Sequence, residues 1–164
     1  TSVRTSVALQ ADLSGELGAQ APLGYFNPLG ICADGDNASF DRLRDMEIKH
    51  GRVAMLAVVG YLTTEAGFRL PGMEGVGSGF DALDMSSLPM EVRGTLPFML
   101  GCIGFLELFM RDVAGTSEFP GDFRNGLRGG FGWDDYSDDT KMKKRAIELN
   151  NGRAAQMGIL ALVR

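Results

Sequence analysis

Histidine and cysteine are scarce in this chain. Its 164 residues include one histidine, His50, and two cysteines, Cys32 and Cys102. The cysteines are 70 residues apart (102 − 32) and match no metal-binding or redox spacing. We therefore expect two unpaired thiols, with Cys102 filling space in an apolar segment as a small hydrophobic residue.

The chain also lacks an excess of positive charge. Its formal net charge at pH 7 is −5, and its densest group of basic residues is KMKKR at 141–145. Proteins bind the phosphates of nucleic acids through clustered lysine and arginine side chains. A nucleic-acid partner is therefore excluded.

Long uncharged hydrophobic runs are missing as well. Residues 1–20 contain no apolar core of the signal-peptide type, so any targeting peptide is expected to have been removed. Nor does the chain contain about 18 consecutive uncharged apolar residues, the usual mark of a membrane span. An ordinary uncharged membrane helix is therefore excluded.

Hydrophobic residues are nevertheless plentiful. They make up 45% of the chain and are accompanied by 23 glycines and 9 methionines. That composition fits either a small integral membrane protein or a soluble protein rich in loops. The length is that of one domain, which we place at 1–164.

Three segments have helical periodicity and are too apolar on too many sides for ordinary surface helices. They are expected at about 40–66, 95–113 and 138–164. The first starts after Ser39 as its N-cap, with Asp41 in the first turn, and ends before Gly67 and Pro71. It is long enough to cross a bilayer with tilt. The sequence predicts an all-α membrane protein with three transmembrane helices joined by long loops.

The first and third helices contain a repeat. EIKHGRVAML at 47–56 and ELNNGRAAQM at 148–157 align with an offset of 101 residues (148 − 47). The alignment pairs Arg44 with Arg145, Glu47 with Glu148, His50 with Asn151, Gly51 with Gly152, Arg52 with Arg153 and Ala54 with Ala155. The repeat predicts that the two helices cross about a pseudo-twofold axis, as internal repeats of membrane proteins often do.

The repeated charges need partners outside their own helix. Glu47 and Arg52 are five residues apart, so their side chains point about 140° away from each other. We expect reciprocal pairs, Glu47 with Arg153 and Glu148 with Arg52, as a twofold contact requires. Such pairing would remove most of the cost of charges in a membrane. Small residues that would let the helices cross closely are at positions 51, 54, 57, 152, 155 and 158.

Ion pairs leave His50 and Asn151 without a role. Each follows its glutamate by three residues on the same helix face, and each has a neutral lone pair that can bind a metal. Glu-x-x-His is also found in di-iron bundles, which need it twice and on four helices. A core histidine with satisfied hydrogen bonds is a further interpretation, and the residues alone leave all of these open.

Several segments resemble one family. The repeated segments are similar to the first and third transmembrane helices of the chlorophyll-binding light-harvesting complex family, whose signatures are Glu-x-x-His-x-Arg and Glu-x-x-Asn-x-Arg. The resemblance is strongest to its chlorophyll a/c branch, the fucoxanthin or peridinin antenna proteins. It is carried by PLGYFNPLG, FDRLRDMEIKHGR, GYLTTEAG, GFLELFMRD, EFPGDFRNG and KMKKRAIELNNGRAAQMGIL, which span about 22–162.

The resemblance implies how pigments would be held. Four ring nitrogens hold the magnesium of chlorophyll in the ring plane, so a protein needs to supply one axial ligand. The ligands implied are Glu47, His50, Glu107, Glu148 and Asn151, with Arg52 and Arg153 neutralising the glutamates of the opposite helices. Without a pigment, Glu107 would be explained by a helical ion pair with Arg111.

In the family, segments before the first and third helices hold carotenoid ends. YFNPLG and GFGWDD have these positions, and the residues implied are Asn27, Pro28, Leu29 and Trp133. Turn formation and anchoring at the membrane interface would also explain these residues.

Two positions depart from the family pattern. Met99 stands where some relatives have a glutamine ligand, so a pigment there would be missing or held through water. Relatives have a further His or Gln ligand fourteen residues after the asparagine, and the sequence stops one residue before it, at Arg164.

The resemblance implies a multi-pass antenna protein of the plastid thylakoid membrane that is not an enzyme. It would bind chlorophyll a, chlorophyll c and carotenoids of the peridinin or fucoxanthin type and the diadinoxanthin type. The implied partners are a photosystem core, I or II, neighbouring antenna subunits and thylakoid lipids. A photoprotective relative that dissipates excitation is an alternative, and a di-iron carboxylate enzyme is a more distant one.

Overall fold

The structure is a computed structural model that describes residues 15–31, 37–83, 90–109, 117–124 and 132–162. Its helices are α1 (Asn37–Glu65), the 3-10 helix η2 (Gly79–Leu83), α2 (Met90–Arg93), α3 (Thr95–Phe109) and α4 (Asp138–Leu162). The only β-type pairing among the described residues is an isolated bridge between Gln20 and Gly24. The prediction of an all-α chain with three long helices is confirmed.

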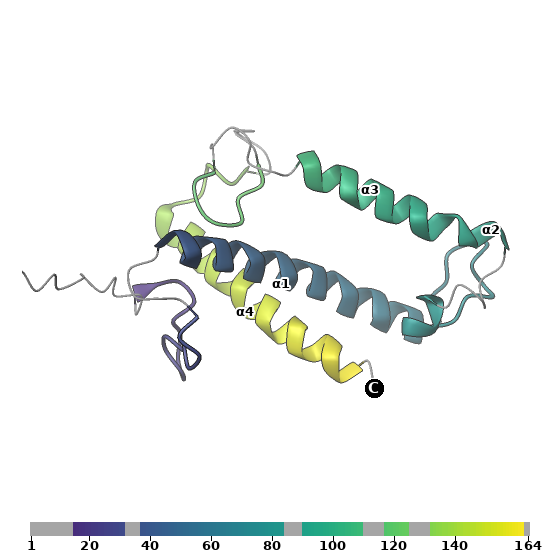
Figure 1. Cartoon of the computed structure of the whole chain (residues 1–164), viewed down its shortest axis with the longest axis horizontal. Coiled ribbons are helices and arrows are strands. Elements are labelled where there is room, and N and C mark those ends of the chain that lie inside the picture. The colour runs from purple at the N-terminus through teal and green to yellow at the C-terminus, as the bar shows by residue number, and fades with distance from the viewer. Residues whose placement is uncertain (1–14, 32–36, 84–89, 110–116, 125–131, 163–164) are drawn as a thin grey trace, which may run out of the picture.

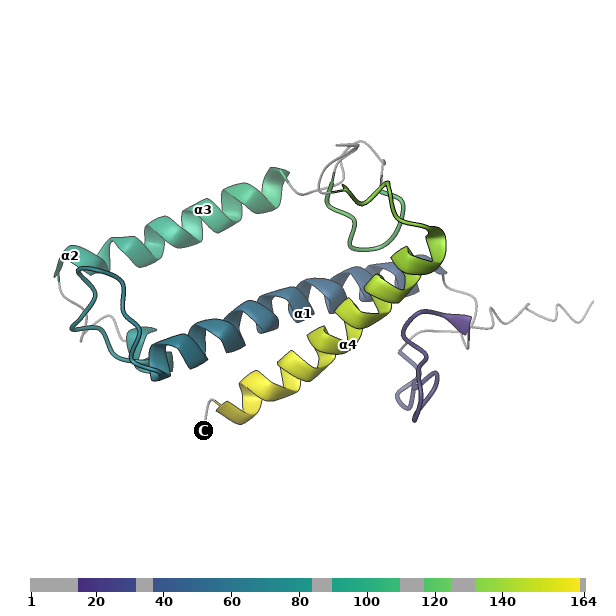
Figure 2. The same ribbon diagram turned by 180° about the vertical axis from the view of Figure 1, so that it is seen from behind.

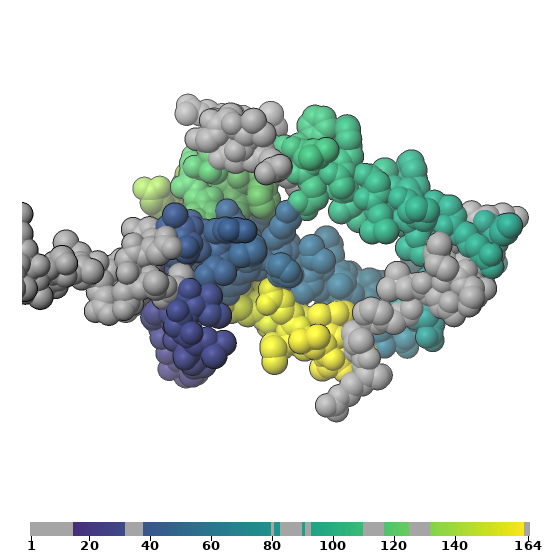
Figure 3. Space-filling view, in the orientation of Figure 1, coloured from purple at the N-terminus to yellow at the C-terminus, as the bar shows by residue number. Residues whose placement is uncertain are grey.

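The three long helices are arranged as one crossed pair and one separate helix (Figures 1 and 2). α1 and α4 begin at the same end of the molecule and run in the same general direction, whereas α3 runs the opposite way. Within the described ranges, no Cα atom of α3 lies within 8 Å of a Cα atom of α1 or α4. Figure 3 shows α3 standing apart from the pair along much of its length.

The predicted start of α1 was wrong by three residues. The helix begins at Asn37, so Ser39 lies inside its first turn and is not the N-cap, and Asp41 falls beyond that turn. The end is as predicted: Gly67 has a positive φ of 87°, and the Phe68 amide bonds the Thr63 carbonyl at 3.1 Å. Glycine adopts that conformation without strain, which lets the chain close a Schellman motif and leave the helix.

The N-terminus of α4 agrees with its sequence signals. The Ser137 hydroxyl lies 2.9 Å from that of Thr140, and Asp138 and Asp139 occupy the first turn. Acidic side chains there interact favourably with the helix dipole. The predicted last residues of the second and third helices, 110–113 and 163–164, lie outside the described residues.

The crossing of α1 and α4 is formed by two glycines. A Cβ atom added to Gly51 would lie 2.9 Å from the Gly152 Cα atom, and one added to Gly152 would lie 3.0 Å from the Gly51 Cα atom. The close contact covers a shorter stretch of each helix than we expected from the six small residues. Ala57 is exposed, and a Cβ atom at Gly158 would meet nothing within 4 Å, because the helices diverge beyond the crossing.

The described residues bury very little apolar surface. Ala54 and Leu149, at 7% and 4% exposure, are the buried hydrophobic residues, and every described residue of α3 is at least partly exposed. Large exposed side chains cover α3, including Phe98, Leu100 and Phe105. None of the described helices combines the length and the uncharged apolar composition expected of a membrane span.

Because the Gly51 and Gly152 backbones touch, Gly51→Ala should destabilise the protein. A methyl group there collides with the facing backbone, and overpacking of this kind costs about 1–3 kcal/mol. Gly60→Ala is the matched control on the same helix, since a Cβ atom there meets nothing within 4 Å. It should stabilise α1 by up to about 1 kcal/mol through helix propensity. Thermal unfolding in detergent, followed by circular dichroism, measures both; equal effects would contradict the close crossing.

Candidate functional site

Both cross-helix ion pairs expected from the repeat are present at the crossing. Arg52 Nε lies 2.6 Å from Glu148 Oε1, and Arg153 Nε lies 2.6 Å from Glu47 Oε1. Each pair joins the glutamate of one helix to the arginine of the other, as a pseudo-twofold axis requires. The four side chains are about one-third exposed, so they are open to further ligands on their outer sides.

Each arginine of the crossing also holds a loop. Arg52 Nη1 donates a hydrogen bond to the Gly121 carbonyl and Arg153 Nη1 to the Gly18 carbonyl, both at 2.9 Å. The two loops lie before α4 and before α1, respectively. The twofold relation therefore extends from the helices to the segments that precede them.

The two glutamates differ in their remaining oxygen atom. Glu47 Oε2 accepts a hydrogen bond from Arg44 Nη1 of its own helix at 2.5 Å. The equivalent arginine, Arg145, lies instead over the Phe119 ring, 4.0 Å from its centroid. Among the described residues, none donates a hydrogen bond to Glu148 Oε2, whereas Glu148 Oε1 accepts one from Arg52.

His50 is oriented for binding a metal through one ring nitrogen. Its Nδ1 lies 2.7 Å from the Met46 carbonyl, which can only accept a hydrogen bond. Nδ1 therefore carries the proton, and Nε2 keeps its lone pair. His50 is exposed and lines a cavity of about 590 Å³ between α1 and α4. Most other residues of this cavity are apolar: Val53, Ala54, Ala57, Ile159 and Leu160.

Asn151 and Glu107 lie on α4 and α3, and neither takes part in the ion pairs of the crossing. Asn151 is exposed on α4 at the position equivalent to His50. Glu107, on α3, is 44% exposed and forms an ion pair with Lys49 of α1 through its Oε2 atom. The alternative partner Arg111 lies outside the described residues, and sequence reasoning missed Lys49.

The residues expected to hold carotenoids fall in two places. Asn27 lines a cavity of about 490 Å³ beside Glu47 and Arg153, and its Oδ1 accepts a hydrogen bond from the Ile31 amide at 3.1 Å. Pro28 and Leu29 are exposed in this turn. Trp133 packs against Phe119 and Tyr136 before α4. Its indole Nε1 is buried and has no hydrogen-bond partner among the described residues.

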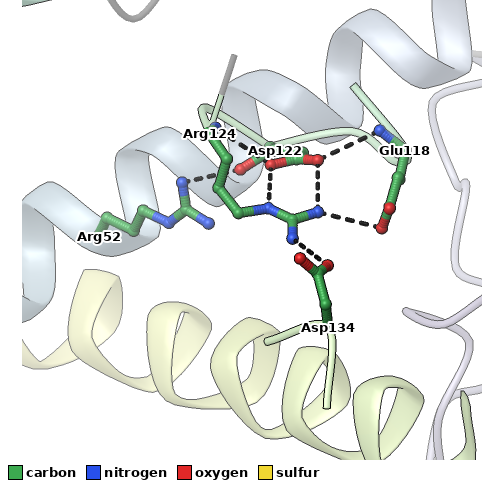
Figure 4. A network of polar contacts seen from close by, with 6 residues as sticks. Arg52, Glu118, Asp122, Arg124 and Asp134 are labelled. Atoms are coloured by element: carbon green, nitrogen blue, oxygen red, sulfur yellow. Dashed lines mark hydrogen bonds and ion pairs between the residues drawn. The ribbon is translucent and has the colours of Figure 1, made fainter. Parts of the chain in front are cut away.

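A charged network shapes the loop that contacts Arg52 (Figure 4). Arg124 bonds Asp122 through Nε and Nη2, both at 2.8 Å, and also contacts Glu118 and Asp134. These bonds lower the pKa of the buried Asp122 to about 2 and raise the pKa of Arg124. The amide of Gly121, the residue before Asp122, donates a hydrogen bond to Asp45 Oδ1 of α1 at 2.5 Å. The network therefore holds the Gly121 carbonyl in the position where it accepts the hydrogen bond from Arg52.

The arrangement suits metals that require one protein ligand each. No three His, Cys, Asp or Glu side chains of the described ranges are placed to hold a metal ion together. His50 Nε2, the Asn151 amide oxygen and single carboxylate oxygens are instead distributed over an apolar surface. Chlorophyll magnesium needs one such axial donor and a flat apolar wall, so these residues fit it.

A family model described as chlorophyll A-B binding protein matches residues 10–164 of the chain. The chain therefore belongs to the chlorophyll a-b binding protein family, which confirms the resemblance seen in its motifs. This family consists of light-harvesting pigment-binding proteins and not of enzymes, so the di-iron enzyme alternative is wrong.

Several similar proteins are named as chloroplastic. Fucoxanthin-chlorophyll a-c binding protein D of Phaeodactylum tricornutum is 57% identical over 163 residues, covering 98% of this chain and 82% of the relative. A fucoxanthin-chlorophyll a-c binding protein of Trieres chinensis is 47% identical, covering 98% and 82%. Protein A of this type from Macrocystis pyrifera is 48% identical, covering 99% and 76%.

Removing an arginine of the crossing should prevent assembly. Arg52→Leu leaves Glu148 unpaired and releases the Gly121 carbonyl, at a cost of about 1.5–3 kcal/mol for lost charged hydrogen bonds. Arg42→Leu is the control, because Arg42 is exposed on the same helix and α1 continues past it. Refolding yield with pigment measures the effect. The exchange Arg52→Glu with Glu148→Arg should restore part of the yield; no difference between Arg52→Leu and Arg42→Leu would argue against the pairing.

Asp122 should make the loop before α4 sensitive to acid only at very low pH. Its pKa falls from 3.8 to about 2 on folding, so its contribution is complete above about pH 4 and is lost as pH falls toward 2. The lowering corresponds to about 2 kcal/mol. Emission from Trp133, the single tryptophan, can follow the loop in detergent. Asp122→Asn should remove the transition and exposed Asp135→Asn should keep it; a wild-type transition above pH 4 would contradict this assignment.

Proposed function

We propose that this chain is a light-harvesting antenna subunit that binds chlorophyll a, chlorophyll c and fucoxanthin and transfers excitation energy to a photosystem. Family membership and high identity to fucoxanthin-chlorophyll a-c binding proteins over nearly the whole chain support this function. The observation that supports it most directly comes from the described residues: they bury almost no apolar side chains, and His50 is exposed beside an apolar cavity as a single metal donor.

Pigments supply the apolar core that the described residues do not form among themselves. The ligands proposed are His50, Asn151, Glu107, Glu47 and Glu148, each binding one magnesium. Glu148 can bind through Oε2 while Oε1 stays paired with Arg52. Glu47 has both oxygens paired, so its magnesium would share an oxygen with Arg44 or Arg153. One carboxylate then serves both the metal and the ion pair.

Carotenoids are proposed to lie along the crossed pair. The cavity beside Asn27 has apolar walls from Leu23, Tyr25 and Phe26 and could hold one end of a long apolar molecule. The buried indole nitrogen of Trp133 would donate to an oxygen at a carotenoid end. Pro28 and Leu29 would contribute exposed apolar surface, and the same segments are proposed to hold a carotenoid of the diadinoxanthin type together with fucoxanthin.

We place the whole chain, as one antenna domain, in the plastid thylakoid membrane with α1, α3 and α4 crossing it. The chloroplast relatives and the exposed apolar surface of α3 support this location. The charges of α1 and α4 are paired at the crossing, which lowers the cost of placing those helices in lipid. A photosystem core, neighbouring antenna subunits and thylakoid lipids are the proposed partners.

The proposed function is to hold pigments in fixed positions, and no covalent bond is made or broken. Crossed helices hold rings at fixed separations and orientations, so excitation moves between them before it is lost. The fluorescence lifetime of the pigmented protein tests this: a lifetime that stays unchanged on mild acidification is expected for a harvesting subunit. A strongly shortened lifetime at low pH would indicate the photoprotective alternative.

His50→Leu should remove about one chlorophyll per polypeptide and leave the others. The leucine fills a similar volume but has no lone pair for magnesium. Val53→Leu is the matched control, since Val53 lines the same cavity and offers no ligand. Pigment extraction and chromatography after reconstitution give the ratio. An unchanged chlorophyll content in His50→Leu would refute this ligand.

A further inference from the structure

Each helix of the crossing has an arginine three residues before its glutamate, Arg44 on α1 and Arg145 on α4. Residues three apart lie on the same face of a helix, so each arginine can reach its glutamate. Arg44 does so, because its Nη1 donates a hydrogen bond to Glu47 Oε2 at 2.5 Å. The guanidinium carbon of Arg145 lies instead 4.0 Å from the centroid of the Phe119 ring, and Glu148 Oε2 accepts no hydrogen bond from a described residue.

The aromatic rings beside the two arginines account for this difference. The Arg44 guanidinium carbon lies 5.1 Å from the centroid of the Phe40 ring, four residues earlier on the same helix. The offset of the repeat places Lys141 at the equivalent position of α4 (40 + 101), so α4 offers Arg145 no ring there. Arg145 stacks on a ring of the loop before α4, which is Phe119. A ring on the same helix leaves the guanidinium within reach of the glutamate, whereas the ring on the loop holds it away.

The loop that carries Phe119 is held in place on several sides. Arg124 bonds Asp122 through two hydrogen bonds of 2.8 Å (Figure 4), and the Asp122 amide donates to the Phe119 carbonyl at 3.0 Å. The Arg124 guanidinium carbon also lies 5.9 Å from the centroid of the Phe119 ring. The hydrogen bond from Arg52 to the Gly121 carbonyl attaches the same loop to α1. The half-buried Phe119 ring therefore has a defined place against α4.

The ring, the arginine and the glutamate share one small cavity. Phe119, Arg145 and Glu148 all line a space of about 220 Å³. A guanidinium that left the ring would have the carboxylate of its own helix to bond, as Arg44 has in Glu47. Hydrogen bonds between guanidinium and carboxylate groups are among the strongest in proteins. Such a bond would compete with magnesium for the same oxygen atom.

We propose that Phe119 is a positioning residue of the chlorophyll bound by Glu148: it holds the Arg145 guanidinium over its ring and so keeps Glu148 Oε2 available to magnesium. This inference rests on the proposed ligand role of Glu148. It makes the two glutamates of the repeat unequal, because an arginine of the same helix occupies the second oxygen of Glu47 and leaves that of Glu148 free.

The test is reconstitution of the full chain with extracted chlorophylls and carotenoids at limiting chlorophyll, followed by chromatography of the bound pigments. Phe119→Leu keeps an apolar side chain but removes the ring, so Arg145 can bond Glu148 and about one chlorophyll per polypeptide should be lost. Phe119→Tyr keeps the ring face and should retain the wild-type content. Phe68→Leu is the matched control, because Phe68 is exposed in the turn after α1.

A double variant separates competition by Arg145 from simple packing of the loop. Arg145→Leu in the Phe119→Leu background removes the competing guanidinium, so the chlorophyll should return although the ring is still absent. If Phe119 only packed the loop, removal of Arg145 would restore no pigment. A double variant as depleted as Phe119→Leu alone would therefore overturn the proposal, and so would wild-type content in Phe119→Leu.

A second double variant distinguishes this inference from the ligand role on which it rests. Arg52→Leu with Glu148→Leu removes the ion pair and the carboxylate together, so no buried charge is left without its partner. Full chlorophyll content in this variant would remove Glu148 from the ligands and end both claims for the site. A chlorophyll lost there but not in Phe119→Leu would keep the ligand and overturn the role of Phe119. Far-UV circular dichroism of each variant measures the helix content separately from the pigments.

Discussion

The reciprocal ion pairs between α1 and α4 are the constraint on which the rest of the structure depends. Each glutamate is neutralised by the opposite helix, so two charged segments can lie together in an apolar setting. The Gly51 and Gly152 contact sets how closely they approach. The same arginines hold the Gly18 and Gly121 carbonyls, so the loops before both helices take their places from the crossing.

Outside this crossing, the described residues bury few apolar side chains against one another. Ala54 and Leu149 are buried, whereas α3 exposes apolar side chains on all sides and stays apart from the other long helices. Apolar area removed from water is the main stabilising term in folding, and the part of the chain that the structure describes removes little by itself. A pigment that binds only the folded state stabilises it by mass action. Binding and folding are therefore one process in this account, with the chlorophylls and carotenoids acting as core.

Much of the crossing could be predicted from the sequence, because the repeat of 101 residues fixes both which residues are equivalent and which must pair across a twofold axis. The helix ends were less predictable. Ser39 has a side chain typical of an N-cap, but α1 already begins at Asn37. Serine is also tolerated in the first turn of a helix. The small residues predicted the crossing correctly at Gly51 and Gly152. The prediction was wrong at Ala57 and Gly158, because the point where the helices diverge depends on tertiary geometry.

The contacts that sequence reasoning missed are those between segments that no repeat relates. Lys49 and Glu107 lie on different helices with no shared motif, and only the placement of α3 brings them together. The Arg124 network depends on a loop conformation that composition does not specify. Arg44 did leave a signal, since it recurs as Arg145 three residues before each glutamate, yet its two copies have different partners in the structure.

The most direct test of the account measures the distance between α1 and α3 with and without pigment. The exposed Cys102 of α3 and a cysteine introduced at Val59 of α1, with Cys32→Ser, can carry spin labels for a pulsed dipolar measurement. The account predicts a broad distance distribution in the stripped protein in detergent and a narrow one after chlorophylls and carotenoids are added. A narrow distribution already present in the stripped protein would contradict it, because the helices would then pack without the pigments.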